Sequence, residues 1–149
     1  MKISFRRKAL LMLLAVLLVL PTLSACGRKI TLDDAEYTMG KLFSALGSGD
    51  YDGIASLMHK ESGVTAGTIQ SFLASVEDKH SANFEDGISN IRYTAHKELP
   101  YNGVPGGSKF RVDGTFNIGS VQNVPFIILL IMDSSGYGIG TIDFGGAVL

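Results

Sequence analysis

The sequence is poor in the residues that build metal centres and disulfides, since its 149 residues include one cysteine and three histidines. A single cysteine forms no disulfide within its own chain. His59, His80 and His96 show no ligand spacing of the His-x-x-x-His kind. His59 and His80 fall at expected helix ends, where the helix dipole favours a cation. The sequence therefore predicts no metal site and no cofactor.

The sequence also lacks a hydrophobic run long enough to span a membrane. The apolar block at residues 9–20, ALLMLLAVLLVL, makes a helix of about 18 Å, against a hydrocarbon layer of about 30 Å. The preceding residues 1–8, MKISFRRK, contain four basic side chains and no acid. A basic start followed by a short apolar block is typical of a secretory signal peptide, so we assign residues 1–25 to a signal peptide that is removed.

The only cysteine, Cys26, follows this block in the stretch Leu23-Ser24-Ala25-Cys26, which resembles the lipobox of bacterial lipoproteins. The resemblance implies cleavage just before Cys26, attachment of a diacylglyceryl lipid to its thiol, and acylation of the new amino group, for example with palmitate. Residues 26–30 then form a short lipidated tether. Two or three acyl chains make release from a membrane very slow. The alternatives are a plain secretory peptide with an incidental cysteine and an uncleaved amphipathic anchor.

This resemblance also implies a location. The protein is expected on the outer leaflet of the cell membrane or, in a bacterium with two membranes, in the outer membrane, because Gly27 rather than Asp follows the cysteine. Residues 26–149 contain nine basic and 14 acidic side chains, which gives a formal charge of −5. That balance argues against a nucleic-acid partner, which requires a basic surface for the phosphates. The expected partner is the membrane, through Cys26.

The spacing of apolar residues divides the rest of the chain into a helical part and a strand part. The expected helices cover 31–47, 50–60 and 68–80, and the expected strands cover 88–99, 109–118, 121–132 and 137–148. The stretch Glu61–Gly67 is expected to hold one short strand at most. Helices followed by strands with short turns predict an α+β fold, in which three N-terminal helices pack on a curved four- to five-stranded antiparallel sheet. One domain, residues 31–149, is expected.

Two motifs accompany this order of elements: FSALGSGDY at residues 43–51 and DSSGYGIGTI at residues 133–142. Together they resemble the nuclear transport factor 2-like, or cystatin-like, domain, which small uncharacterised bacterial lipoproteins often carry. The resemblance implies a cone-like fold, in which a curved sheet folds around the helices and leaves a cavity open at one end. Enzymes, ligand-binding proteins and dimerisation modules all use this fold, so the resemblance alone does not assign a function.

Aromatic residues on the expected elements are candidates for lining such a cavity, or for filling the core instead. They are Phe43, Phe72, Tyr93, Phe110, Phe116 and Tyr137. A ketosteroid isomerase with this fold uses an acid and a tyrosine. Here Tyr37 falls beside the apolar stripe of its helix, and Asp113 alternates away from the apolar face of its strand. The sequence therefore predicts no catalytic residues.

The segment Phe126–Met132 is apolar on both faces of its expected strand. Phe126, Ile128, Leu130 and Met132 share one face and meet the helices, whereas Ile127, Leu129 and Ile131 point the other way. This second row needs a cover, which a sheet closing on itself or a second protein provides. We expect Ile127, Leu129 and Ile131 to form an interface, either in a homodimer or with another envelope protein.

The sequence thus predicts a membrane-anchored, extracytoplasmic lipoprotein that binds a ligand or a protein at the cell envelope without catalysis. One alternative is a small enzyme of the isomerase or dehydratase type that works in the cone cavity. Another is a structural envelope lipoprotein. An enzyme needs a buried acid or histidine beside a tyrosine, with room for a substrate, whereas a binding module tolerates a filled interior.

Overall fold

The computed structural model describes residues 29–103 and 106–149. The signal peptide expected over residues 1–25, the lipid attachment at Cys26 and the residue after it, Gly27, lie outside the described residues. Within the described part of the chain, no helix combines the length and the apolar character that are needed to cross a membrane.

Three α-helices come first in the described chain: α2 (Leu32–Ser48), α3 (Tyr51–Leu57) and α4 (Ala66–His80). Each begins after a side chain that accepts a hydrogen bond from a backbone amide of the first turn, namely Thr31, Asp50 and Thr65. Thr31 and Asp34 form a reciprocal capping box, because each side chain accepts a hydrogen bond from the other residue's amide. The helix starts expected at Thr31 and Asp50 are therefore confirmed.

Two details of the helical part differ from the sequence prediction. The third helix begins at Ala66 because the Thr65 hydroxyl, rather than that of Thr68, caps it by accepting the Thr68 amide at 3.3 Å. The short strand expected within Glu61–Gly67 is wrong. The stretch begins within a 3-10 helix, η2 (Lys60–Ser62), which Gly63 caps, and ends within the first turn of α4.

The second part of the chain forms one five-stranded antiparallel sheet after a short 3-10 helix, η3 (Phe84–Asp86). Its strands are β1 (Ile88–Leu99), β2 (Ser108–Ile118), β3 (Val121–Asp133), β4 (Gly136–Phe144) and β5 (Ala147–Val148). Each strand pairs with the next one along the chain. The last expected strand, 137–148, is divided into β4 and β5 because Gly145 and Gly146 both adopt positive φ values and reverse the chain. The α+β fold is confirmed.

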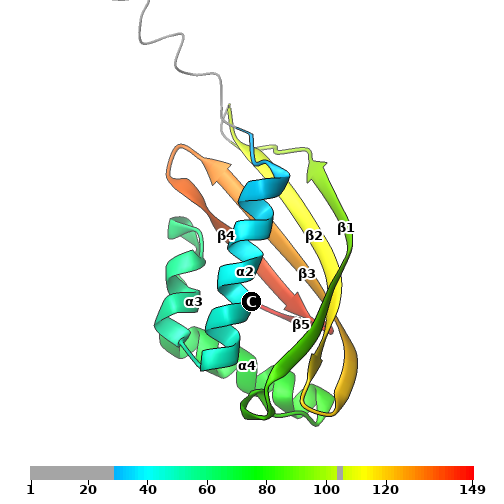
Figure 1. Cartoon of the computed structure of the whole chain (residues 1–149). Coiled ribbons are helices and arrows are strands. Elements are labelled where there is room, and N and C mark those ends of the chain that lie inside the picture. Colours follow the sequence, from blue (N-terminus) through cyan, green and yellow to red (C-terminus); the bar gives the residue numbers. More distant parts are fainter. Residues whose placement is uncertain (1–28, 104–105) are drawn as a thin grey trace, which may run out of the picture.

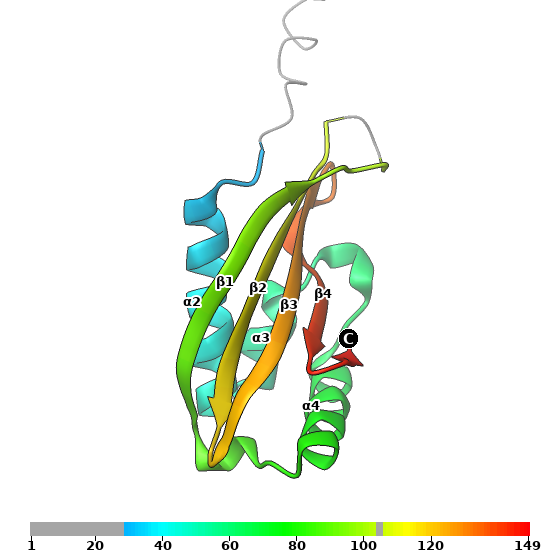
Figure 2. The same cartoon turned by 90° about the vertical axis from the view of Figure 1, so that its right-hand side faces the viewer.

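The helices lie on one side of the sheet, and the strands bend over them (Figure 1). Helix α2 runs along β1, and α4 packs near β5 at the other edge of the sheet (Figure 2). The apolar stripe of α2 includes Met39 and Leu42, and that of α4 includes Ile69 and Val76; all four side chains are fully buried. The buried face of the sheet is therefore the one that faces the helices.

Aromatic rings fill the space between the two layers. Phe43 of α2 makes edge-to-face contacts with Phe116 of β2 and Phe126 of β3, at ring-centroid distances of 5.5 and 5.3 Å. Phe126 has room because its neighbour on β2 is Gly114, where any Cβ would meet the Phe126 ring and the Arg92 carbonyl oxygen. Each buried phenylalanine contributes about 1.5–3 kcal/mol through removal of its side chain from water.

Candidate functional site

Residues 29–30 enter the domain at the end of the sheet where β1 ends and β2 begins, which we call the tether end. Lys29 forms an ion pair with Glu98 of β1 at 3.0 Å. The Ile30 amide donates a hydrogen bond to the Ser108 hydroxyl at the start of β2, and the Ile30 side chain is buried. The turn between β3 and β4 lies at the same end, because Ser108 pairs with Met132.

Four polar side chains from three separate segments meet at the tether end. They are His59, which follows α3, Tyr101 from the loop after β1, and Asp133 and Ser135 from the turn between β3 and β4. We call these four residues the polar cluster. His59 is 5% exposed, and the Asp133 side chain is 7% exposed. The cluster is therefore a largely buried set of ionisable and hydroxyl groups.

Backbone contacts with β4 hold His59 in place. The His59 amide donates to the Ile139 carbonyl oxygen at 2.8 Å, and Met58 forms a parallel bridge with the same Ile139. The close approach requires glycine at position 138, because a Cβ there would lie 2.7 Å from the Cα and N atoms of His59. The end of α3 is thus fixed against β4, with the imidazole directed at the β3–β4 turn.

Asp133 is the centre of the polar cluster. Its Oδ1 atom accepts hydrogen bonds from the Ser135 hydroxyl at 2.7 Å and the Ser135 amide at 2.8 Å, and its Oδ2 atom accepts one from the Tyr101 hydroxyl at 2.9 Å. These bonds, those from Ser135 first, hold the pKa of Asp133 well below its usual value. The bond to Asp133 also raises the pKa of Tyr101. Asp133 is therefore a carboxylate at neutral pH.

The polar cluster contains a serine, a histidine and an aspartate but does not have the geometry of a proton relay. Ser135 Oγ and Asp133 Oδ1 both contact the same imidazole nitrogen, His59 Nε2, at 3.1 and 3.2 Å. In a relay the acid and the nucleophile contact opposite nitrogens of the imidazole. Ser135 also donates its hydroxyl hydrogen to Asp133. This arrangement does not activate Ser135 as a nucleophile.

A shallow pocket of about 240 Å³ opens beside the cluster. Its lining includes His59, Asp133, Tyr101 and the exposed Glu61 of η2. One donor atom each of His59, Glu61 and Asp133 lies within 4.8 Å of the other two. The pocket therefore brings one imidazole and two carboxylates together at its wall.

The six aromatic candidates do not share one cavity. Phe43, Phe72, Phe110 and Phe116 are buried members of the core. Tyr137 is 37% exposed, and its hydroxyl contacts the Thr38 hydroxyl at 2.7 Å. Tyr93 is 48% exposed on β1 and meets the edge of the core through Phe126.

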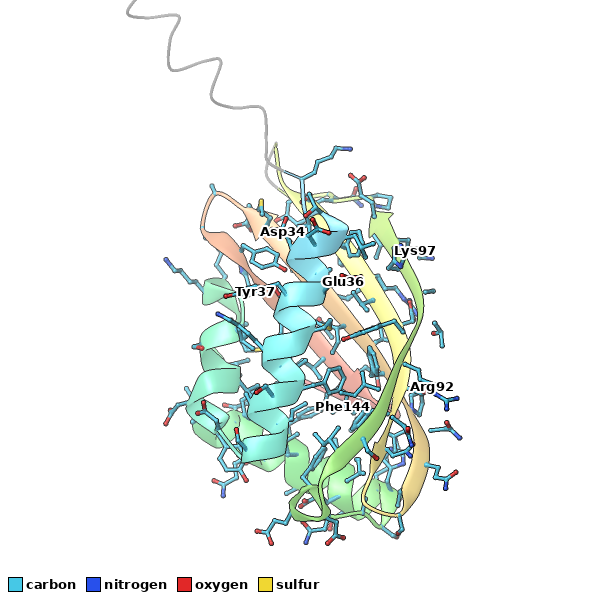
Figure 3. All side chains as sticks on the ribbon, viewed as in Figure 1. Asp34, Glu36, Tyr37, Arg92, Lys97 and Phe144 are labelled. Carbon is cyan, nitrogen blue, oxygen red and sulfur yellow. The ribbon has the colours of Figure 1, made fainter. Side chains whose placement is uncertain are left out.

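Tyr93 lines a small space between α2 and β1. The space measures about 40 Å³, and Glu36, Met39, His96 and Val112 also line it. Glu36 lies on the side of α2 that faces β1 (Figure 3). Burial, and then the negative charge of Glu36, raise the pKa of Tyr93. An acid, a histidine and a tyrosine thus line one space. Pockets for organic ligands usually measure about 300–1,000 Å³, so this space is too small for such a ligand.

The two residues considered for an isomerase-like set lie away from this space. Tyr37 is 66% exposed on α2, where Lys41 lies over its ring at 4.5 Å from the centroid. Asp113 accepts a hydrogen bond from Arg111 Nε at 2.8 Å on the sheet face opposite the helices. Neither residue approaches Tyr93 and His96 in the lining of the space between α2 and β1.

The expected interface row lies on the sheet face that points away from the helices, which we call the outer face. Ile127, Leu129 and Ile131 alternate with buried residues along β3, and each is partly exposed. They lie level with Asp113, Arg111 and Lys109 of β2, respectively. The apolar row is thus bordered by the charged outer positions of β2.

A larger groove of about 510 Å³ lies at the opposite end of the domain from the tether. Its lining comes from the α2–α3 turn, α4 and η3, and it includes Gly47, Tyr51, Glu77, Phe84 and Glu85. One carboxylate oxygen of Glu77 accepts a hydrogen bond from the Phe84 amide at 2.8 Å, and this bond holds the start of η3. No histidine or basic residue lines the groove within the described chain, so it offers less varied chemistry than the polar cluster.

Sequence reasoning missed the polar cluster. His59 and Asp133 are 74 positions apart, so no local pattern joins them. The sequence Asp133-Ser-Ser135 is typical of a turn in which the aspartate carboxylate accepts a hydrogen bond from the amide two residues later. Nothing local links that turn to His59, because the link depends on how α3 docks on β4.

Comparison with known proteins adds no family to this geometry. No protein-family model matches the chain, and no curated protein matches it.

Proposed function

We propose that the protein is a lipid-anchored lipoprotein of the cell envelope with a nuclear transport factor 2-like domain that associates, without catalysis, through the outer face of its sheet. The partly exposed row of Ile127, Leu129 and Ile131 carries this proposal. The partner that fits this row best is a second copy of the same chain.

The sequence of the first 26 residues supports the anchor, and the described tether end supports a close approach to the bilayer. Four Cα-to-Cα steps separate Cys26 from the buried Ile30, a reach of at most about 15 Å. The Lys29–Glu98 ion pair and the Ile30–Ser108 hydrogen bond fix where the tether leaves the domain. The tether end of the sheet would therefore face the lipid headgroups.

The interior supports a binding role without a small-molecule substrate. Helix stripes and sheet residues fill the space that the cone-like fold would leave open, and phenylalanine rings meet at its centre. The space that remains beside Tyr93 and His96 measures about 40 Å³ and admits about one or two water molecules. An isomerase or dehydratase would need a larger cavity at this position.

Anchoring restricts how two copies can meet. Both domains would hang from one bilayer by their tether ends, so the two-fold axis runs along the bilayer normal and roughly along the strands. Each member of the apolar row then meets its own counterpart, and β1 and β2 of one copy face β4 of the other.

The charges of the outer face suit this arrangement. The outer positions of β1 and β2 include the basic residues Arg92, Lys97, Lys109 and Arg111, whereas β4 presents Asp143 level with Ile127. Arg92 and Lys97 project from β1 away from the helices (Figure 3). Asp113 of β2 is also level with Ile127, so it would lie opposite Asp143 of the other copy, and the Arg111 side chain that pairs with Asp113 would supply positive charge beside the two acids.

Sedimentation of the full chain in detergent micelles tests the association. We expect a dimer for the wild type and at least a 10-fold higher dissociation constant for Leu129→Lys, because a charge at the centre of the row is desolvated on pairing. Ser44→Lys, on an exposed position of α2, is the matched control and should leave the dimer intact. A monomeric wild type would contradict the proposal and would favour another envelope protein as the partner.

A further inference from the structure

We propose that His59, Glu61 and Asp133 bind a divalent transition-metal ion, with Zn²⁺ as the best match. The inference rests neither on the anchor nor on the dimer, and the pocket shares Ile131 with the apolar row of the outer face. It follows from the distances among the three donor atoms, from the hydrogen bonds that position His59 and Asp133, and from the negative charge of the two carboxylates.

The donor atoms already have the spacing of metal ligands. His59 Nε2 and Asp133 Oδ1 are 3.2 Å apart. A tetrahedral zinc ion with bonds of about 2.0–2.1 Å separates its ligand atoms by about 3.4 Å. An ion can therefore replace the imidazole proton between these two atoms with little movement of either backbone. The Glu61 carboxylate lies within 4.8 Å of both and sits on an exposed side chain that can turn inward.

The two buried ligands are held by groups that do not themselves bind the ion. Tyr101 donates to Asp133 Oδ2, the oxygen that faces away from His59, and Ser135 fixes the carboxylate from the β3–β4 turn. The His59 backbone is bonded to Ile139. Such supporting hydrogen bonds orient the ligands of metal sites and strengthen binding.

The charge of the site also favours a cation. Two carboxylates, Glu61 and Asp133, share the pocket wall and both bring negative charge to it. Within the described chain, the only ion-pair partner of Asp133 is His59, and Glu61 has none. A dication neutralises both acids at once. The pocket of about 240 Å³ leaves space for water on the open side of the ion.

The ligand types select among metals. One imidazole and two carboxylates without a thiolate suit Zn²⁺ and Mn²⁺, whereas Ca²⁺ and Mg²⁺ prefer oxygen ligands alone. Affinity for a site with a nitrogen ligand rises from Mn²⁺ to Zn²⁺. Three protein ligands leave a fourth, open position on zinc, which faces the pocket. We therefore expect Zn²⁺ to bind more tightly than Mn²⁺, and Ca²⁺ to bind weakest.

Isothermal titration of Zn²⁺ into the chelator-treated full chain tests the site, using protein in detergent micelles without a polyhistidine tag. We expect one Zn²⁺ per chain. At a Zn²⁺ concentration 100-fold above Kd, the melting temperature should rise by about 10 °C, because the ion binds only the folded state. Glu61→Gln should weaken binding at least about 10-fold. It should leave folding intact, because the Glu61 side chain is exposed and makes no hydrogen bond within the described chain.

The matched control is Glu85→Gln, which removes one negative charge from an exposed glutamate of the other 3-10 helix, η3. It should bind Zn²⁺ as the wild type does. Equal affinities of Glu61→Gln and the wild type would overturn the proposal, since the polar cluster would then be a hydrogen-bond network only. Absence of Zn²⁺ binding by the folded wild type would overturn it as well.

Discussion

At the scale of single residues, two glycines show how the same residue type meets opposite constraints. Gly138 of β4 lies against the backbone of His59, and a Cβ there would be 2.7 Å from two backbone atoms. Gly40 lies within α2, and a Cβ there meets no atom within 4 Å. No local sequence pattern shows that Gly138 is needed, because that need arises from the docking of α3 on β4.

These contacts predict opposite effects of alanine at the two positions. Gly138→Ala should destabilise the protein by about 1–3 kcal/mol, because the added methyl forces His59 and β4 apart. Gly40→Ala should stabilise it by about 0.5–1 kcal/mol, because alanine is the better residue in an unobstructed helix interior. Chemical denaturation of both variants measures the two free energies. A Gly138→Ala variant as stable as the wild type would show that α3 does not pack against β4 as described.

At the scale of elements, the sequence predicted the order and type of every long helix and strand, because apolar spacing of 3.6 or 2 residues follows from which face is buried. The start of a helix was predicted less accurately where two residues can each act as its N-cap. Thr65 and Thr68 both precede the apolar stripe of α4, and the structure assigns the cap to Thr65. The predicted four- to five-stranded sheet allowed for a fifth strand, but the two residues of β5 were included in the last expected strand, 137–148.

The assignment of this cap predicts that two similar substitutions differ. Thr65→Ala should cost about 1 kcal/mol, because the Thr68 amide loses its acceptor at the helix start. Thr68→Ala should be nearly neutral, because Thr68 lies inside the first turn, where alanine has the higher helix propensity. The unfolding free energies of both variants show which of the two threonines caps α4. A larger loss for Thr68→Ala would place the helix start where the sequence alone had predicted it.

At the scale of the whole molecule, the α+β class followed from the sequence, whereas the candidate site did not. The sheet register brings the β3–β4 turn beside the start of β2, and the docking of α3 adds His59. No local pattern encodes these two steps, so the meeting of His59 and Glu61 with the distant Asp133 could not be predicted. The outer row of β3 was predictable because a strand that is apolar on both faces requires a second cover.

The proposed anchoring by Cys26 would decide where both proposed surfaces operate, because the tether end and the outer face would gain their orientation from the bilayer. Palmitate labelling of the full chain in cells, with Cys26→Ser and the control Ser24→Ala, tests it most directly. We predict that the wild type and Ser24→Ala incorporate label and are processed, because Ala keeps the small side chain before the cysteine. Cys26→Ser should lose all label and remain a precursor. Label and processing that persist in Cys26→Ser would contradict the account.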